Sequence, residues 1–132
     1  MYSFEELKSL IEQFELPERF DMVVAIANGG IIPAAMLNQR LGAEFHLLKF
    51  SLRDPMQRPM YDKPRLVEEP GFDVAGRRAL LVEDRVKSGA TLQMARQLLI
   101  DRGAATVRTF AVNGPADYSL LDVPCFRFPW IL

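Results

Sequence analysis

Two adjacent acids, Glu83 and Asp84, directly follow an apolar run and come shortly before a small-residue segment at residues 88–91. Paired carboxylates accept hydrogen bonds from vicinal hydroxyls, and backbone amides at the start of a helix bind phosphate. The stretch "LLVEDRVKSGATLQMARQLL" therefore indicates a site for a polyol phosphate. It is neither a Walker motif nor a Gly-x-Gly-x-x-Gly motif. On this stretch alone, an alternative stays open in which the acids are a solvated strand end and Ser88 is a helix cap.

The elements that must position these residues alternate between strand and helix patterns. Apolar, β-branched runs predict five strands, and apolar residues at helical spacing predict three helices between or before them. A capping box of Ser3 and Glu6 opens the first helix, which Pro17 closes. The predicted strands are 22–27, 43–50, 78–83, 105–112 and 123–128, and the other predicted helices are 31–41, ending at Gly42, and 90–103. This order predicts a three-layer α/β fold with a mostly parallel, twisted sheet, whose carboxyl-terminal strand ends bind the ligand.

Composition narrows the class of protein. The 132 residues are 49% hydrophobic and 25% charged with a net charge of −1, which suits one domain over residues 1–132 and indicates no nucleic-acid or membrane partner. One cysteine, Cys125, and one histidine, His46, exclude an internal disulfide and a thiol zinc cluster. Without a signal peptide or membrane-length apolar run, a cytoplasmic protein is expected. Four prolines between residues 51 and 71 predict a long flexible loop.

"ALLVEDRVKSGATL" resembles the phosphoribosyl-pyrophosphate motif of the type I phosphoribosyltransferases. The resemblance implies that paired acids hold the ribose hydroxyls and that loop amides hold the 5′-phosphate. Upstream, "VVAIANGGIIPAAMLNQRLG" resembles the pyrophosphate loop of that family, in which backbone amides bind diphosphate, often beside a cis peptide. By position, the catalytic roles fall on Glu83, Asp84 and Lys87, phosphate binding on Ser88, Gly89, Ala90 and Thr91, and pyrophosphate binding on Asn28, Gly29, Gly30 and Arg53.

The C-terminal stretch "ADYSLLDVPCFRFPWIL" resembles the tail of the bacterial xanthine–guanine and hypoxanthine branch, with a short C-terminal strand and hood. The resemblance implies that the base meets Asn113, Phe126, Phe128 and Trp130. Three positions depart from that branch. Lys87 replaces an aspartate, Asn113 replaces a lysine, and Cys125 stands near the place of a stacking aromatic residue. The phosphoribosyl half of the site is therefore complete, whereas the base half does not identify an acceptor.

The implied function is a Mg²⁺-dependent phosphoribosyltransferase that moves the phosphoribosyl group to a nucleobase, possibly a purine, and releases diphosphate. Mg²⁺ would ride mostly on the ligand, with Glu83 and Asp84 nearby and no direct protein ligand. A homodimer is expected. One rival is a regulatory domain that binds phosphoribosyl pyrophosphate or a nucleotide without turnover, and another is a structural α/β module.

Overall fold

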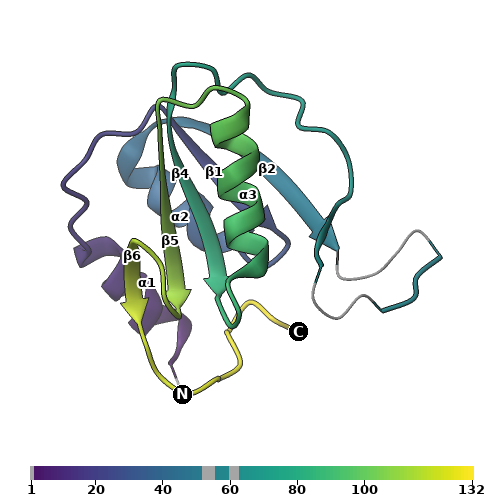
Figure 1. Ribbon diagram of the computed structural model, residues 1–132. Helices are drawn as coiled ribbons and strands as arrows, with labels where there is room; N and C mark the ends of the chain where they lie inside the picture. Colours follow the sequence, from purple (N-terminus) through teal and green to yellow (C-terminus); the bar gives the residue numbers. More distant parts are fainter. Residues whose placement is uncertain (1, 52–55, 60–62) are drawn as a thin grey trace.

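The computed structural model describes residues 2–51, 56–59 and 63–132. Within them, six strands form one sheet in the order β3-β2-β1-β4-β5-β6 (Figure 1). All neighbouring strands are parallel except β3, which is antiparallel to β2. The predicted mostly parallel α/β sheet is therefore confirmed. The strands are β1 (Met22–Ala27), β2 (Glu44–Ser51), β3 (Arg65–Leu66), β4 (Arg78–Arg85), β5 (Thr106–Asn113) and β6 (Tyr118–Leu121).

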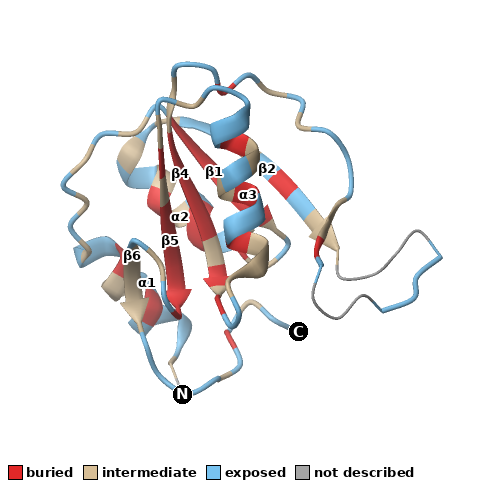
Figure 2. Ribbon diagram, viewed as in Figure 1, coloured by how far each residue is buried: buried red, intermediate tan, exposed pale blue. Residues whose placement is uncertain are grey.

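Helices cover both faces of the sheet, which makes three layers (Figures 1 and 2). The helices are α1 (Phe4–Gln13), α2 (Ile31–Leu41) and α3 (Ala90–Asp101). Side chains alternate along β1, so that Val24 packs in one cluster with Leu92 and Leu99 of α3. Val23 faces the other way and packs with Leu37 of α2. Both faces of β1 are therefore buried, as its continuous apolar run predicts.

Local signals set the helix ends. The Ser3 hydroxyl accepts a hydrogen bond from the Glu6 amide and the Glu6 carboxylate accepts one from the Ser3 amide, both at 3.1 Å, which confirms the capping box. α2 ends at Gly42, whose φ of 59° is left-handed. α1 ends at Gln13, four residues before Pro17, because Phe14 already has extended backbone angles. The prediction that Pro17 closes this helix was therefore wrong by one turn.

The predicted strand at 123–128 was wrong, and the last strand is β6. β6 begins at Tyr118, earlier than the predicted strand, because Asp117 is held beside Thr109 of β5. The Asp117 carboxylate accepts a hydrogen bond from the Thr109 amide at 3.0 Å, and the Asp117 amide donates one to the Thr109 hydroxyl at 2.9 Å. Past β6, the carboxamide of Asn113 bonds both backbone polar groups of Val123, at 3.1 and 3.0 Å. Pro124 then lacks the amide hydrogen that a sheet ladder needs. Residues 122–132, here called the tail, consequently have no strand.

The segment predicted as a loop, residues 51–71, includes the short strand β3. Phe50 pairs with Leu66, and Ser51 pairs with Arg65. Residues 52–55 and 60–62 lie outside the described residues, and so does the candidate Arg53. The flexibility of this loop stays a prediction. Among the helices of the described residues, none has the length and apolar character needed to cross a membrane.

Replacing Gly30 with alanine should destabilise the fold, because a Cβ there would lie 2.2 Å from the Val82 carbonyl oxygen and 2.8 Å from that of Ile26. We expect Gly30→Ala to lower the free energy of unfolding by about 1–3 kcal/mol in urea denaturation. Gly71→Ala is the matched control, since a Cβ at Gly71 meets nothing within 4 Å. Equal stability of the two variants would contradict the close approach at Gly30.

Candidate functional site

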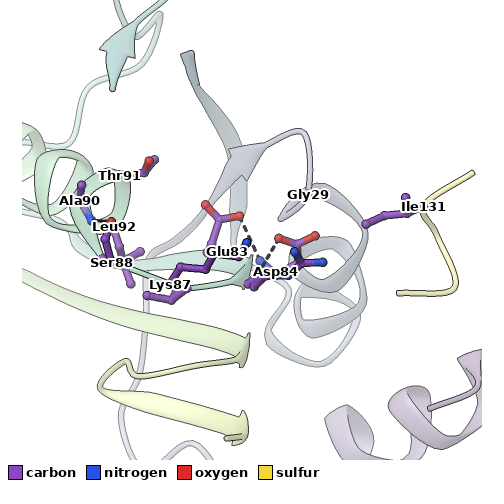
Figure 3. Close-up of a pocket in the computed structure, with 12 residues that line it drawn as sticks. Gly29, Glu83, Asp84, Lys87, Ser88, Ala90, Thr91, Leu92 and Ile131 are labelled. Carbon is purple, nitrogen blue, oxygen red and sulfur yellow. Dashed lines mark hydrogen bonds between the residues drawn. The ribbon is translucent and has the colours of Figure 1, made fainter. Parts of the chain in front are cut away.

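A cavity of about 460 Å³ lies where β4 ends and α3 begins. Its volume is in the range of small-molecule sites. Most of the residues predicted from the acid pair and the small-residue segment line it, although they come from different elements (Figure 3). The lining consists of Gly29, the continuous run 83–92 and Ile131. The structure thus brings the acid pair, the segment 87–91 (here the phosphate loop) and one glycine of residues 28–30 (here the pyrophosphate loop) to one place.

Asp84 joins the two loops. Its side chain is buried, and a Cβ on Gly29 would lie 2.4–2.5 Å from the carboxylate atoms. Figure 3 shows Asp84 between the phosphate loop and Gly29. Oδ1 accepts a hydrogen bond from the Arg85 amide at 2.6 Å, and Oδ2 accepts a long one from Trp130 Nε1 at 3.5 Å. Glycine at position 29 is therefore required for the carboxylate to take this position.

Glu83 lies beside Asp84 and has an unusual protonation equilibrium. Burial, and then the negative charge of Asp84, raise the pKa of Glu83 to about 8. Glu83 Oε1 also accepts a hydrogen bond from the Asp84 amide at 3.1 Å. At neutral pH, Glu83 consequently holds its proton for most of the time. The pair can then offer one hydroxyl donor as well as carboxylate oxygens to a ligand.

The phosphate loop leads into a helix whose N-cap residue, a glycine, offers no side-chain cap. Gly89 is the N-cap of α3 with a left-handed φ of 81°, and no side chain hydrogen-bonds to the cap. A Cβ at Gly89 would meet only Val86 Cγ1, at 3.9 Å, so the backbone angle rather than crowding favours glycine here. Ser88 Oγ accepts a hydrogen bond from the Ala90 amide at 3.2 Å. The remaining amides of the first turn and the helix dipole provide an anion site.

The pyrophosphate loop follows a cis peptide bond between Ala27 and Asn28. The Gly30 amide donates to the Ile26 carbonyl at 2.8 Å, and Asn28 is exposed at the start of α2. A second cavity, of about 220 Å³, adjoins this strand end. Glu83 and Thr91 line both cavities. The two cavities therefore adjoin at Glu83 and Thr91, and of residues 28–30 only Gly29 lines one of them.

The predicted base-binding residues lie in different surroundings, and some are half-buried while others are buried. Trp130 is half-buried and reaches Asp84, whereas Phe128 is buried and stacks on Trp130 with ring centres 5.0 Å apart. Phe126 contacts Phe128 edge-on at 4.8 Å. Asn113 is buried and does not line the cavity, since Val123 occupies both ends of its carboxamide. Its role toward a base stays a prediction.

Sequence reasoning missed Arg85 and Ile131, which both line the cavity. Arg85 had a usable signal. It follows the acid pair directly, and strand alternation places it on the face of β4 that carries Glu83. Ile131 had none, because its place depends on the path of the irregular tail. Lys87 lines the cavity with its side chain exposed, and its catalytic role stays a prediction.

Comparison with known proteins agrees with this geometry. Residues 5–127 match the model of the phosphoribosyl transferase domain family. The chain is 33% identical over 124 residues to a xanthine-guanine phosphoribosyltransferase of Chromohalobacter salexigens, covering 88% of this chain and 72% of that protein. It is 29% identical over 93 residues to an orotate phosphoribosyltransferase of Sulfurisphaera tokodaii, covering 70% of this chain but 43% of that protein. For three of the curated relatives it matches, the chain spans only 30–48% of their length.

Solved structures show the same fold. A purine phosphoribosyltransferase from Pyrococcus horikoshii superposes with a TM-score of 0.82 at 20% identity, covering 98% of this chain and 91% of that one. A protein from Neisseria gonorrhoeae with bound ppGpp gives a TM-score of 0.75 at 19% identity, covering 99% and 88%. At these identities, the likeness concerns the fold.

Replacing Glu83 with glutamine should remove a pH-dependent cost of folding. The pKa of Glu83 is about 8 in the folded chain against an ordinary 4.5, so the unfolded chain loses this proton first as pH rises. The free energy of unfolding therefore decreases as the pH rises from 4.5 to about 8. From pH 5 to pH 8, we expect the parent to lose about 2–4 kcal/mol of unfolding free energy relative to Glu83→Gln.

Urea denaturation across that pH range measures the difference. The control is Glu68→Gln, which makes the same substitution at an exposed position beyond β3 and should keep the pH profile of the parent. Parallel profiles of the parent and Glu83→Gln would show that burial does not perturb Glu83.

Proposed function

The chain belongs to the phosphoribosyltransferase family, and from that premise we propose that it transfers the 5-phosphoribosyl group of phosphoribosyl pyrophosphate to a nucleobase. The bond from the anomeric carbon to diphosphate breaks, a bond to a ring nitrogen forms, and that nitrogen loses its proton. The observation that carries the proposal is the packing of Asp84 on Gly29, which brings the acid pair, the phosphate loop and Gly29 to the wall of one cavity.

Each part of the site has a role in this proposal. Asp84 and Glu83 hold the ribose hydroxyls. The amides of the phosphate loop, residues 87–91, hold the 5′-phosphate beside the Lys87 ammonium group. The amides of the pyrophosphate loop, residues 28–30, hold the departing diphosphate. Catalysis would then rest on positioning the reactants and stabilising the charge on the leaving group. Arg53, which we also expect at the diphosphate, lies outside the described residues.

The donor set near the acid pair fits Mg²⁺ carried by the substrate. Among the described residues, no group of three or more histidine, cysteine or acidic side chains is arranged to hold a metal. Glu83 and Asp84 still provide the hard oxygen atoms that Mg²⁺ prefers, at the wall of the cavity. When bound, Mg²⁺ would neutralise diphosphate charge. The proposed cofactor is therefore Mg²⁺ that the substrate brings, with the two acids nearby.

The acceptor belongs to the same proposal. Relatives carry the names xanthine-guanine, adenine and orotate phosphoribosyltransferase, so the family match alone leaves the base open. A purine acceptor and a role in purine salvage are proposed from the xanthine-guanine relative. A cytoplasmic location stays a prediction. The rival function, ligand binding without turnover, predicts that phosphoribosyl pyrophosphate binds while no base causes diphosphate release.

An exposed apolar patch supports the expected homodimer. Phe45 and Leu47 of β2 pair in register with Val23 and Ala25, so they point to the α2 side of the sheet, yet both are exposed. Ile32 of α2 is exposed as well. Covering such side chains with a partner lowers the free energy, because it removes apolar surface from water. We propose that Phe45 and Leu47, which lie on one face of β2, contact the same residues of a second chain, and sedimentation would detect this dimer.

Replacing Asp84 with asparagine should weaken the binding of phosphoribosyl pyrophosphate. The variant loses a charge-assisted hydrogen bond to a ribose hydroxyl, worth about 1.5–3 kcal/mol, or roughly 10- to 150-fold in affinity. Calorimetric titration measures the affinity, and thermal unfolding shows whether the variant folds. Asp101→Asn is the control, because it removes one charge at the opposite end of α3. Parent-like affinity of Asp84→Asn would refute the ribose role.

Replacing Lys87 with aspartate tests whether its charge holds the anionic substrate. A negative charge beside bound phosphate should lower affinity for phosphoribosyl pyrophosphate by about 10- to 100-fold at low salt, and less at high salt. Lys8→Asp makes the same charge change on the exposed face of α1 and should have no effect. Turnover on hypoxanthine, guanine and xanthine is measured in parallel. Unchanged affinity with new purine turnover would assign Lys87 to the base half instead.

A further inference from the structure

We infer that Arg85 selects the acceptor: its guanidinium group receives a planar heterocycle through an oxo or carboxylate oxygen and disfavours one that presents an amino group there. The inference rests on the proposed function and concerns only the acceptor half of the site. Arg85 is the last residue of β4, directly after the acid pair, and it lines the 460 Å³ cavity. The cation therefore lies next to the residues that would hold the ribose.

The guanidinium group of Arg85 has hydrogen-bonding capacity to spare. Its Nε atom is buried and has no hydrogen-bond partner in the described part of the chain. Nη2 donates to the Phe126 carbonyl, but at 3.3 Å. No ion pair involves Arg85 among the described residues. Because a buried donor without an acceptor costs free energy, this half-buried cation is a place where an acceptor on a ligand is favoured.

Aromatic side chains fix the plane next to that cation. The guanidinium carbon of Arg85 lies 5.8 Å from the centre of the Phe128 ring, and Phe128 stacks on Trp130 with only 4° between the ring planes. Trp130 is half-buried and contacts Asp84. Phe128 is buried, so these rings support the cation from the protein side, and the N–H edge of the guanidinium group is left for the polar edge of a flat ligand.

The chemistry of the guanidinium group gives the direction of the preference. The arginine side chain has only hydrogen-bond donors, so it binds oxo and carboxylate oxygens. An amino group also presents donors, so the two groups cannot form a hydrogen bond and repel each other. Asn113, the other residue expected at the base, has both ends of its carboxamide bonded to Val123. Arg85 is therefore the polar side chain of the cavity wall that remains to read the edge of the heterocycle.

The test uses product nucleotides, because their binding requires no turnover. Calorimetry compares xanthosine, orotidine and adenosine 5′-monophosphates on the parent, Arg85→Met and Arg85→Lys. We expect the parent to bind an oxo nucleotide about 10- to 100-fold more tightly than the adenosine nucleotide. Arg85→Met should abolish that preference while binding ribose 5-phosphate as the parent does. Arg85→Lys, which keeps the charge without the planar fork, should retain part of it. Arg102→Met, at the end of α3, is the control.

The outcomes separate the two proposals. If the parent binds neither ribose 5-phosphate nor phosphoribosyl pyrophosphate, the proposed function fails and the role of Arg85 fails with it. If both ligands bind but the parent shows no oxo preference, or Arg85→Met keeps one, only the role of Arg85 is overturned. If Arg85→Met does not fold, Arg85→Lys decides, because an undiminished preference in that folded variant would exclude recognition by the planar fork.

Discussion

The close packing of the Asp84 carboxylate on Gly29 is the contact on which the arrangement of the site depends. β1 and β4 are neighbours in register from Met22–Ala79 to Ala25–Val82, so their carboxyl ends meet at one edge of the sheet. A side chain on Gly29 would occupy the space of the carboxylate. Since β1 and β4 are buried on both faces, the core fixes the two strand ends, and the missing side chain lets the loops above them close together.

The same closeness explains the electrostatics of the acid pair. Ionising both of two neighbouring acids at a buried strand end costs free energy, and this cost raises the pKa of Glu83. A ligand that brings hydroxyl groups or a cation would relieve this cost, because it supplies the partners that water provides at an exposed acid. The pair is thus costly to folding, and perturbed pKa values of this kind are common at functional sites, which is consistent with the proposed binding role.

Local sequence patterns predicted the parts of the fold whose causes are local. The β-branched run at 22–27, the capping box at Ser3 and the glycine at position 42 each correspond to an observed element or boundary. The phosphate loop was predictable because its residues are contiguous. The strand predicted at 123–128 failed because the carboxamide of Asn113 bonds both backbone polar groups of Val123, and because Pro124 lacks the amide hydrogen that a sheet ladder needs. Arg85 was missed although strand alternation places it on the face of Glu83, whereas its contacts with Phe126 and Phe128 were not predictable because no local pattern indicates the path of the tail.

The two halves of the proposed site are formed by different kinds of structure, one regular and one irregular. The phosphoribosyl half consists of strand ends and helix starts anchored in the buried core, so its geometry follows from the fold itself. One residue of the tail, Phe128, packs with Leu7 and Val112 in a buried cluster. The rest of the tail, which faces the proposed acceptor half, lies outside the sheet and is held by hydrogen bonds such as that between Asn113 and Val123. Irregular segments of this kind tolerate substitution better than core strands do. Under the proposed function, we therefore expect a change of acceptor to require substitutions in the tail and at position 85, while the residues proposed to hold the ribose and its phosphates stay unchanged.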